Sequence, residues 1–408
     1  MRFVIVGAGP AGMRAAEVLR MQAPDAEIVL IGDEPHLPYQ RPPLSKAFIT
    51  ERLTSEALYL KPESFFAEQR IQLKLGAAAT RIDRAAKSVE LGDGTRLGYD
   101  KLLLATGCRG RRLPAAIETV PIYYLRSLGD ADRIREALAP GIEIVMIGGG
   151  FIGLEIAASA TKLGAKVTVL EAAPRLMSRA MPPVISDFVR RLHEKRGVRF
   201  EFEARVKQIR PGEGHCAFVA TERAAYSGSL LIAGIGAEPN TELAEAAGLA
   251  VEDGIRVDHC GRTSDPDIFA AGDATRHDNP LLGRPIRVES WQVALNQGAI
   301  VARNMAGAAE PYSELPWLWT DQYDCNIQML GFFDPDLEMI LRGDPMSHAF
   351  TVLGLDPAGR IASAITVNTG RDMSVIRRLV ASNARVPKDA LADPGRKLAD
   401  LLKAARTA

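Results

Sequence analysis

The chain has 408 residues, enough for two or three domains, which excludes a small disulfide-stapled scaffold or a single binding module. Its 50 Lys and Arg balance 50 Asp and Glu, and this zero formal charge argues against a partner that is nucleic acid or a membrane surface. With 47% hydrophobic and 25% charged residues, the composition is typical of a folded globular protein.

The first predicted elements are a strand, a tight glycine turn and a helix. Residues 2–6 are apolar and run directly into the turn GAGPAG at residues 7–12. Residues 13–21 have helical composition, and residues 27–31 form a second strand that ends just before Asp33. The chain therefore opens with one βαβ unit.

The same arrangement is predicted again 141 residues later. An apolar strand at residues 143–147 leads into the turn GGGFIG at residues 148–153. A helix follows to about residue 163, and a strand at residues 166–170 ends at Glu171. The sequence thus contains two copies of a strand, glycine turn, helix and strand.

The remaining apolar segments complete these two units and add a third region. We expect strands at residues 99–105, 230–236 and 267–271 and a helix from about residue 289 to residue 304. From Pro311 the composition becomes aromatic, and strands follow near residues 338–342, 350–355 and 361–368. The predicted fold class is α/β, with two Rossmann-like dinucleotide-binding domains and a C-terminal α+β domain.

Each glycine turn fits the binding of a dinucleotide. A GxGxxG turn lets a pyrophosphate approach the amides at a helix N-terminus, where the helix dipole favours negative charge. An acidic residue after the next strand can bind the adenosine ribose, and Asp33 and Glu171 follow Gly7 and Gly148 by 26 and 23 positions. One such turn can be a packing device, but two complete copies favour two dinucleotides, and hence an electron relay.

These turns, with LLLATG at 102–107 and FAAGD at 269–273, resemble the two-dinucleotide-binding flavoprotein reductases of the glutathione-reductase superfamily. Four further segments resemble, more narrowly, the NADH-dependent ferredoxin reductases that serve bacterial oxygenases. They are LPYQRPPLSK at 37–46, YLRSL at 124–128, RVESW at 287–291 and WLWTDQY at 317–323. The resemblance implies an FAD-binding domain at residues 1–108 and 233–310, an NAD-binding domain at 109–232 and a C-terminal domain at 311–408.

The resemblance also implies the cofactor residues. Those for FAD are Gly7, Gly9, Gly12, Asp33, Lys46, Arg126, Asp273 and Trp291. Those for NAD are Gly148, Gly150, Gly153 and Glu171. Ala79 and Gly236 are further cofactor-binding positions.

Lys46, Glu155 and Trp319 are the residues that the resemblance places at the reacting rings. A cationic Lys46 near the flavin would stabilise charge on the reduced ring. Glu155 resembles the family glutamate that faces the nicotinamide, and it is expected to pair with Lys46. The alternative is an ordinary exposed helix carboxylate, but the apolar neighbours of Glu155 favour a buried, paired one.

The carboxylate at position 171 also bears on the choice between NADH and NADPH. A carboxylate there binds a ribose hydroxyl and repels a 2′-phosphate, which favours NADH. Arg175 and Arg179 follow closely and could bind the 2′-phosphate of NADPH, so the preference for NADH over NADPH is not fixed by Glu171 alone.

The route by which electrons leave is constrained by the cysteines. Residues 41–46 hold no cysteine, so the dithiol relay of the disulfide reductases is excluded. The four cysteines lie at least 44 positions apart, so no metal site or disulfide framework is predicted: Cys108, Cys216, Cys260 and Cys325. The resemblance implies single-electron transfer to a separate [2Fe-2S] ferredoxin that supplies a cytochrome P450 or a ring-hydroxylating dioxygenase.

Two basic regions could attract such a partner. Residues 371–408 hold nine Lys or Arg against four Asp, and residues 108–112 hold three Arg. A solvated surface is an equally good interpretation of both.

Other functions on the same scaffold stay open from sequence alone: a rubredoxin reductase, an NADH oxidase, or a redox-sensing interaction flavoprotein of the apoptosis-inducing-factor type. The longest central uncharged run, residues 144–154, is too short to span a bilayer, and no secretory signal is visible at the N-terminus. We therefore expect a cytoplasmic protein; the sequence leaves its oligomeric state open between a monomer and a weak homodimer.

Overall fold

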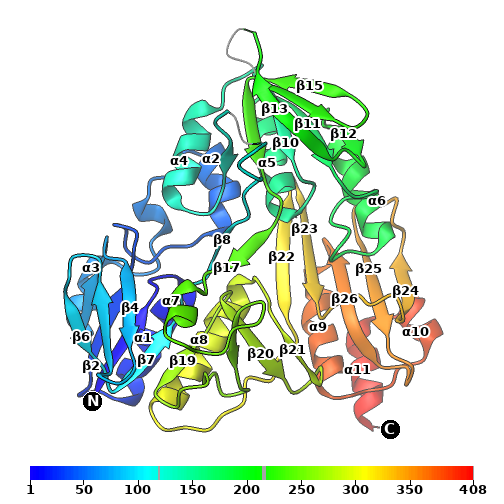
Figure 1. The fold of residues 1–408 in the computed structure, drawn as a ribbon. Helices are drawn as coiled ribbons and strands as arrows, with labels where there is room; N and C mark the ends of the chain where they lie inside the picture. Colours follow the sequence, from blue (N-terminus) through cyan, green and yellow to red (C-terminus); the bar gives the residue numbers. More distant parts are fainter. Residues whose placement is uncertain (118–119, 214–216, 408) are drawn as a thin grey trace. The chain divides into compact units, whose positions relative to one another are not determined.

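The computed structural model describes residues 1–117, 120–213 and 217–407 (Figure 1). The chain divides into two compact units, each built from three separate stretches of sequence. Unit 1 comprises Met1–Pro43, Leu53–Arg109 and Ala237–Pro316. Unit 2 comprises Leu44–Arg52, Gly110–Gly236 and Trp317–Ala408. The assignment of one cofactor to each predicted domain stays a prediction.

Unit 1 is built on a five-stranded parallel sheet in the order β19-β7-β1-β2-β3. Its strands are β1 (Arg2–Val6), β2 (Glu27–Ile31), β3 (Ile71–Lys74), β7 (Lys101–Leu104) and β19 (Ile268–Ala270). The central strands are apolar on both faces, as expected for a parallel sheet with both faces covered. This confirms the predicted strands at residues 2–6 and 27–31.

Helices α1 (Pro10–Gln22) and α8 (Trp291–Met305) cover this sheet and contact each other along their length. Their close approach depends on small residues, since a Cβ added at Gly298 would lie 2.5 Å from the carbonyl oxygen of Ala11. Helix α1 begins three residues before the predicted start because Gly9 is its N-cap and Pro10 occupies the first turn, where proline is favoured. Helix α8 begins after Ser290, whose hydroxyl caps it.

Two smaller sheets and three short helices complete unit 1. The antiparallel sheet β4-β5-β6 and the sheet β18-β20-β21 belong to it. Their strands are β4 (Ala79–Asp83), β5 (Ser88–Leu91), β6 (Arg96–Gly98), β18 (Ile255–Val257), β20 (Thr275–Asn279) and β21 (Arg284–Ile286). The helices are η2 (Glu56–Leu58), α3 (Glu63–Glu68) and α7 (Glu242–Ala246). The chain passes between the units five times: within η1 (Pro42–Ser45), after Arg52, within β8 (Cys108–Gly110), at the start of β17 (Ala237–Pro239) and after Pro316.

Unit 2 contains a second five-stranded parallel sheet, in the order β12-β11-β10-β16-β9. Its strands are β9 (Tyr123–Tyr124), β10 (Glu143–Ile147), β11 (Lys166–Glu171), β12 (Arg199–Phe202) and β16 (Leu230–Ala233). Helices α2 (Ala47–Thr50), α4 (Leu128–Ala137), α5 (Phe151–Lys162) and α6 (Pro183–Glu194) belong to the same unit. The antiparallel sheet β13 (Val206–Pro211), β14 (Ala217–Thr221) and β15 (Ala225–Gly228) completes this region.

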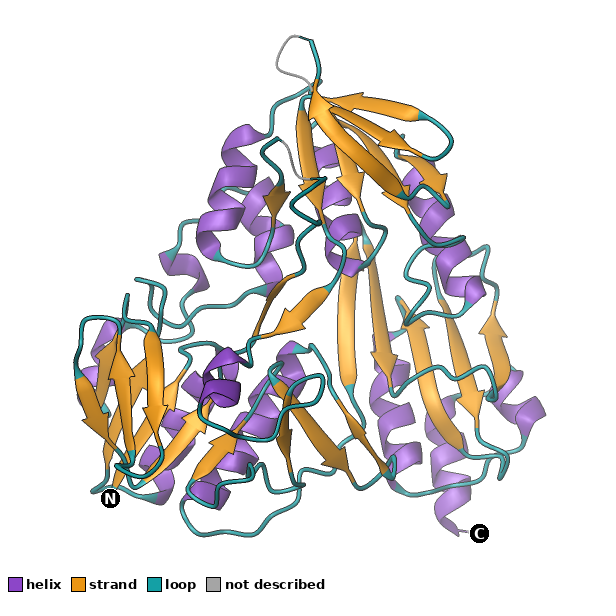
Figure 2. Cartoon of the chain, in the orientation of Figure 1, coloured by secondary structure: helices purple, strands orange, loops and turns teal. Residues whose placement is uncertain are grey.

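The C-terminal part of unit 2 is an antiparallel sheet in the order β22-β23-β26-β25-β24. Its strands are β22 (Trp317–Gln322), β23 (Cys325–Leu330), β24 (Glu338–Gly343), β25 (Phe350–Leu355) and β26 (Ile361–Val367). Figure 2 shows helix α9 (Gly370–Ala381) beside these strands, and α10 (Lys388–Ala392) and α11 (Leu398–Thr407) follow. One apolar cluster joins this sheet to α5 and α6, and it includes Leu154, Phe188 and Ile365.

The predicted α+β composition of the C-terminal region agrees with these elements, although by compactness it belongs to unit 2. Cys108, Cys260 and Cys325 are buried cysteines that form no disulfide with one another, and Cys216 lies outside the described residues. Within the described part of the chain, every helix is too short or too polar to traverse a bilayer.

Candidate nucleotide and redox site

The first glycine turn has the geometry that a phosphate-binding loop requires. Gly7 has a φ of +114°, and a Cβ there would lie 2.1 Å from the carbonyl oxygen of Ala105. A Cβ at Gly12 would lie 1.9 Å from the carbonyl oxygen of Gly7, so both positions exclude every side chain. At Gly9, by contrast, an added Cβ would meet no described atom within 4 Å. The turn is therefore closely packed against the protein at Gly7 and Gly12 and open at Gly9.

The second turn repeats this geometry in unit 2. Gly148 has a φ of +102°, and a Cβ there would lie 2.5 Å from the carbonyl oxygen of Gly234. A Cβ at Gly153 would lie 2.6 Å from the carbonyl oxygen of Gly148. Gly150, the N-cap of α5, has only ordinary contacts at 3.8 Å among the described atoms. Both turns thus present helix N-terminal amides to open space, which fits the pyrophosphate of a dinucleotide.

The acidic residue beyond each second strand lies where the sequence predicts it. Asp33 is exposed just beyond β2. Glu171 ends β11, and its carboxylate accepts hydrogen bonds from the amide of Gly149 at 2.6 Å and that of Ala173 at 2.7 Å. These contacts fix the Glu171 carboxylate beside the second glycine turn, where a ribose hydroxyl of a bound nucleotide can reach it.

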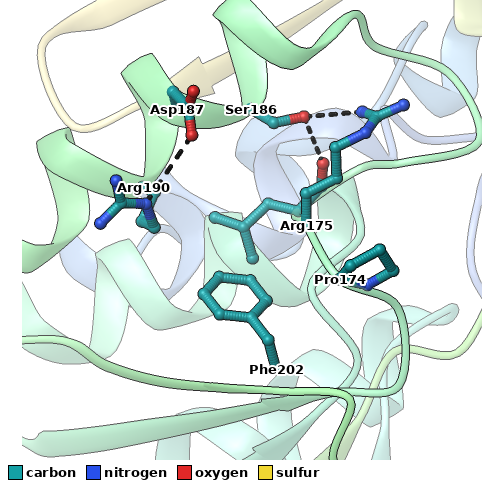
Figure 3. Close-up of a pocket in the computed structure, with 7 residues that line it drawn as sticks. Pro174, Arg175, Ser186, Asp187, Arg190 and Phe202 are labelled. Carbon is teal, nitrogen blue, oxygen red and sulfur yellow. Dashed lines mark hydrogen bonds and ion pairs between the residues drawn. The ribbon is translucent and has the colours of Figure 1, made fainter.

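The side chain of Arg175 is committed to the protein. Its guanidinium donates to the carbonyl oxygens of Met181 and Ser178 and to the hydroxyl of Ser186 at 2.9 Å. Figure 3 shows Arg175 turned toward Ser186 beside a small pocket. Arg175 therefore organises the loop after β11 and is poorly placed to receive a 2′-phosphate.

The other arginine of this loop, Arg179, is exposed. A Cβ added at Gly236, whose φ is +112°, would lie 3.1 Å from an Arg179 guanidinium nitrogen. Arg179 thus lies beside a predicted cofactor-binding position.

Lys46 and Glu155 form the predicted ion pair within unit 2. The Nζ of Lys46 lies 2.9 Å from the Oε2 of Glu155, whose side chain is only 3% exposed. Lys46 is the N-cap residue of α2, and Glu155 lies on the buried face of α5. The exposed-carboxylate alternative for Glu155 is therefore wrong, because the helix face that carries it packs against other parts of unit 2.

Two hydroxyl groups that the sequence did not single out complete this cluster. The Ser45 hydroxyl donates to the Oε2 of Glu155, and the Thr320 hydroxyl donates to its Oε1 at 2.6 Å. One turn along α5, the hydroxyl of Ser159 donates to the carbonyl oxygen of Ser45 at 2.6 Å. The spacing of Glu155 and Ser159 is the one signal that could have found this face, because residues four apart share one side of a helix.

The other predicted FAD residues fall in both units. In unit 1, Ala79 begins β4 and Trp291 begins α8. In the same unit, the carboxylate of Asp273 accepts a hydrogen bond from the thiol of Cys108 at 3.3 Å. Arg126 lies in unit 2, just before α4, and its amide donates to the carboxylate of Asp130. Their assignment to FAD stays a prediction.

Trp319 lies in β22 next to Trp317, with ring centroids 5.4 Å apart. Successive side chains of a strand point to opposite faces, so Trp319 and Thr320 face opposite sides of the sheet. The structure brings Thr320 to the Lys46 and Glu155 pair. The role of Trp319 at the reacting rings stays a prediction.

Part of the predicted basic charge is neutralised locally. Arg109 pairs with Glu238 and Glu242, and Lys388 pairs with Glu338. The use of the two basic regions for docking therefore stays a prediction.

Comparison with known proteins identifies relatives along nearly the whole chain. Residues 1–298 match the family described as pyridine nucleotide-disulphide oxidoreductase, and residues 317–402 match that described as reductase C-terminal. The anthranilate 1,2-dioxygenase system ferredoxin–NAD(+) reductase component of Burkholderia cepacia is 49% identical over 393 residues, covering 96% of this chain and 97% of that protein.

A second relative is the 3-phenylpropionate/cinnamic acid dioxygenase ferredoxin–NAD(+) reductase component of Photorhabdus laumondii subsp. laumondii. It is 40% identical over 385 residues, covering 94% of this chain and 97% of that protein. Among solved structures, the covalent putidaredoxin reductase–putidaredoxin complex contains a chain that matches with a TM-score of 0.95 and 36% identity. That match covers 100% of this chain and 99% of the other.

Proposed function

The chain belongs to the pyridine nucleotide-disulphide oxidoreductase family, and on this premise we propose that it is an FAD-dependent ferredoxin reductase driven by NADH. Its electron acceptor is a [2Fe-2S] ferredoxin that supplies a ring-hydroxylating dioxygenase or a cytochrome P450. The observation that carries this proposal is the presence of two complete dinucleotide-binding turns in one chain, each with an acidic residue beyond the following strand. Bound FAD would supply the redox chemistry of this site, namely hydride acceptance from NADH and single-electron release to the acceptor.

The chain's own residues bind and orient the two nucleotides. The amides at the start of α1 and α5 favour the two pyrophosphates, and the Glu171 carboxylate favours a nucleotide with a free 2′-hydroxyl. Glu155 holds the ammonium group of Lys46 in a fixed position, so that its positive charge is preorganised before any reaction. Positioning and electrostatics, rather than acid–base chemistry, are the contributions of the protein.

A ferredoxin acceptor is favoured over a dithiol because residues 41–46, which include η1 and the N-cap residue of α2, hold no cysteine where a disulfide reductase carries its cysteine pair. The rubredoxin reductase, NADH oxidase and interaction-flavoprotein alternatives are not favoured, since the relative described above at 49% identity is named as the ferredoxin reductase component of a dioxygenase system. We infer a cytoplasmic location, where NADH is available, and cell fractionation tests this inference.

The test is an anaerobic stopped-flow experiment on the purified protein. NADH should bleach the flavin absorbance, and adding an oxidised [2Fe-2S] ferredoxin should restore it with two ferredoxins reduced per NADH. Parallel reactions with rubredoxin, oxygen and a dithiol acceptor should be much slower. Absence of bleaching, or fast turnover of the dithiol, would contradict the proposal.

A charge variant sharpens this test. Lys46→Gln should slow flavin reduction by about 100-fold, the usual cost of removing one preorganised electrostatic group. The matched control is Lys61→Gln, because Lys61 also forms an ion pair at 2.9 Å, with Glu17, but away from Glu155. Equal rates of flavin reduction in the Lys46→Gln and Lys61→Gln variants would show that Lys46 has no role at the redox site.

A further inference from the structure

A line of buried polar side chains runs from Glu155 into the C-terminal sheet of unit 2. The Thr320 hydroxyl lies 2.6 Å from the Oε1 of Glu155, and the side-chain amide of Gln322 donates to the same hydroxyl at 2.8 Å. The Nε2 of His193 lies 3.0 Å from the Oε1 of Gln322. Thr320, Gln322 and His193 are all fully buried, although they come from β22 and α6.

The chemistry of these groups gives the line one direction. An ionised Glu155 carboxylate only accepts hydrogen bonds, so the Thr320 hydroxyl must donate its one hydrogen to the carboxylate. Gln322 must then present its NH₂ group to Thr320, because its oxygen would meet an oxygen with no proton left to donate. The amide oxygen therefore accepts from the Nε2–H of His193. This leaves His193 Nδ1 as an acceptor toward the Tyr323 hydroxyl, 3.5 Å away.

The neutral state of His193 is consistent with this direction. Burial of the ring lowers its pKa to about 4, against the opposing effect of the Gln322 hydrogen bond. A neutral imidazole with its proton on Nε2 is the one form that donates to Gln322 and still accepts from Tyr323. Every donor in the line thus points toward Glu155.

The two oxygens of Glu155 depend on different partners. Ser45 and Lys46 both contact Oε2, whereas among the described residues Thr320 alone donates to Oε1. A buried carboxylate oxygen without a donor is costly, and it would turn toward any other donor within reach. Thr320 therefore fixes the rotation of the carboxylate that faces Lys46.

The line is suited to orientation and not to proton conduction. A chain that conducts protons needs groups that can each accept one proton and release another, and the amide of Gln322 does not do this readily. Its planar group instead holds the Thr320 hydroxyl in one rotamer. The apolar cluster around β22 and α6 keeps water from replacing these contacts.

We propose that Thr320, Gln322 and His193 are positioning residues that act through Glu155, forming an oriented hydrogen-bond line that fixes the carboxylate holding Lys46. This inference rests on the proposed function, because it assigns these residues to the same redox site. None of the three needs to touch a nucleotide for this role.

The experiment compares Thr320→Val, which has the same shape without the hydroxyl, with Thr320→Ser, which keeps the hydroxyl. Thr320→Val should lower the limiting rate of flavin reduction by NADH about tenfold, the equivalent of one hydrogen bond to a charged group. The NADH concentration at half-maximal rate and the flavin content should stay unchanged. Thr320→Ser should restore most of the rate, which a purely packing role would not explain.

The matched control is Thr366→Val in β26 of the same sheet, since this buried hydroxyl has no partner among the described residues. It should reduce flavin at the parent rate. Gln322→Leu breaks the line one step further from Glu155 and should give a smaller loss than Thr320→Val. It also serves as the test if Thr320→Val does not fold.

Parent-like rates in Thr320→Val and Gln322→Leu, or equal losses in the Val and Ser variants at position 320, would overturn the inference. The proposed function fails separately, if the parent protein itself is not reduced by NADH or turns over a dithiol acceptor quickly. The two failures are therefore distinguishable in one set of stopped-flow traces.

Discussion

The two open glycines, Gly9 and Gly150, allow the two nucleotide sites to be perturbed one at a time. Each is the N-cap of its helix, with φ of −80° and −83°, so alanine can adopt either backbone conformation. A methyl group at Gly9 meets no described atom within 4 Å, whereas one at Gly12 would collide with the carbonyl oxygen of Gly7 at 1.9 Å. Gly9→Ala therefore leaves the fold intact and changes only the space in front of the helix.

The magnitude follows from what enters that space. A pyrophosphate that approaches the amides of α1 must move away from the new methyl group or strain against it, at a cost of about 1–3 kcal/mol. This weakens FAD binding by about 10- to 100-fold. Gly150→Ala, where the nearest described atom lies 3.8 Å away, should impose a similar penalty on NADH.

The assay is a crossed titration of flavin-free protein with FAD and of holoprotein with NAD⁺. Gly9→Ala should lose affinity for FAD and keep its affinity for NAD⁺, and Gly150→Ala should do the reverse. Gly129→Ala is the control, because Gly129 lies in the exposed first turn of α4 with no described atom within 4 Å of an added Cβ. Urea unfolding of the flavin-free proteins should give parent-like midpoints for all three variants.

Gly12→Ala should fail this stability test, because it forces two backbone segments apart. The reasoning is refuted if Gly9→Ala and Gly150→Ala bind both nucleotides as tightly as the parent. It is equally refuted if flavin-free Gly9→Ala unfolds as readily as Gly12→Ala.

Three further predictions concern single side chains. The buried ring of His277 has no hydrogen-bond partner among the described residues, and burial lowers the pKa of His277 to about 4. The free energy of unfolding that the neutral ring contributes is therefore lost as the pH drops from 6.5 to 4, by about 3 kcal/mol. His277→Leu should therefore lose less stability than the parent between pH 7 and 4.5 in urea titrations, and an identical loss would contradict this. Glu171→Gln should lower kcat/KM for NADH about tenfold and reduce the preference for NADH over NADPH, while the flavin content, measured as the control, stays at the parent value. An unchanged ratio of kcat/KM for NADH to kcat/KM for NADPH would exclude ribose recognition by Glu171. Ser159→Ala leaves the carbonyl oxygen of Ser45 without its donor and should destabilise the protein by about 1–3 kcal/mol in thermal unfolding, whereas a parent-like midpoint would show that the contact is dispensable.

The two glycine turns could be predicted from sequence because their causes are local. A positive φ at Gly7 or Gly148 and the close approach at Gly12 or Gly153 require glycine whatever surrounds the turn. The flanking strands can be predicted because they are short apolar runs, and the alternation of strand and helix predicts the parallel sheets. Element ends were less certain, and those of α1 and α8 depend on the cap residues Gly9 and Ser290.

The surroundings of Glu155 were decided only by the tertiary structure. Ser45 lies 110 residues before it and Thr320 lies 165 residues after it, and neither residue stands out by type, period or spacing. The tertiary structure also decided the place of the short stretch Leu44–Arg52, which belongs to unit 2 although the chain on both sides of it belongs to unit 1.

The amino-acid sequence by itself determined where the chain must turn tightly and which strands are buried, because backbone sterics and hydrophobic periodicity act over a few residues. The tertiary structure alone decided which hydroxyl groups meet a buried carboxylate. A hydrogen bond between distant segments depends on how helices and sheets pack, and it leaves no pattern in the segments that it joins.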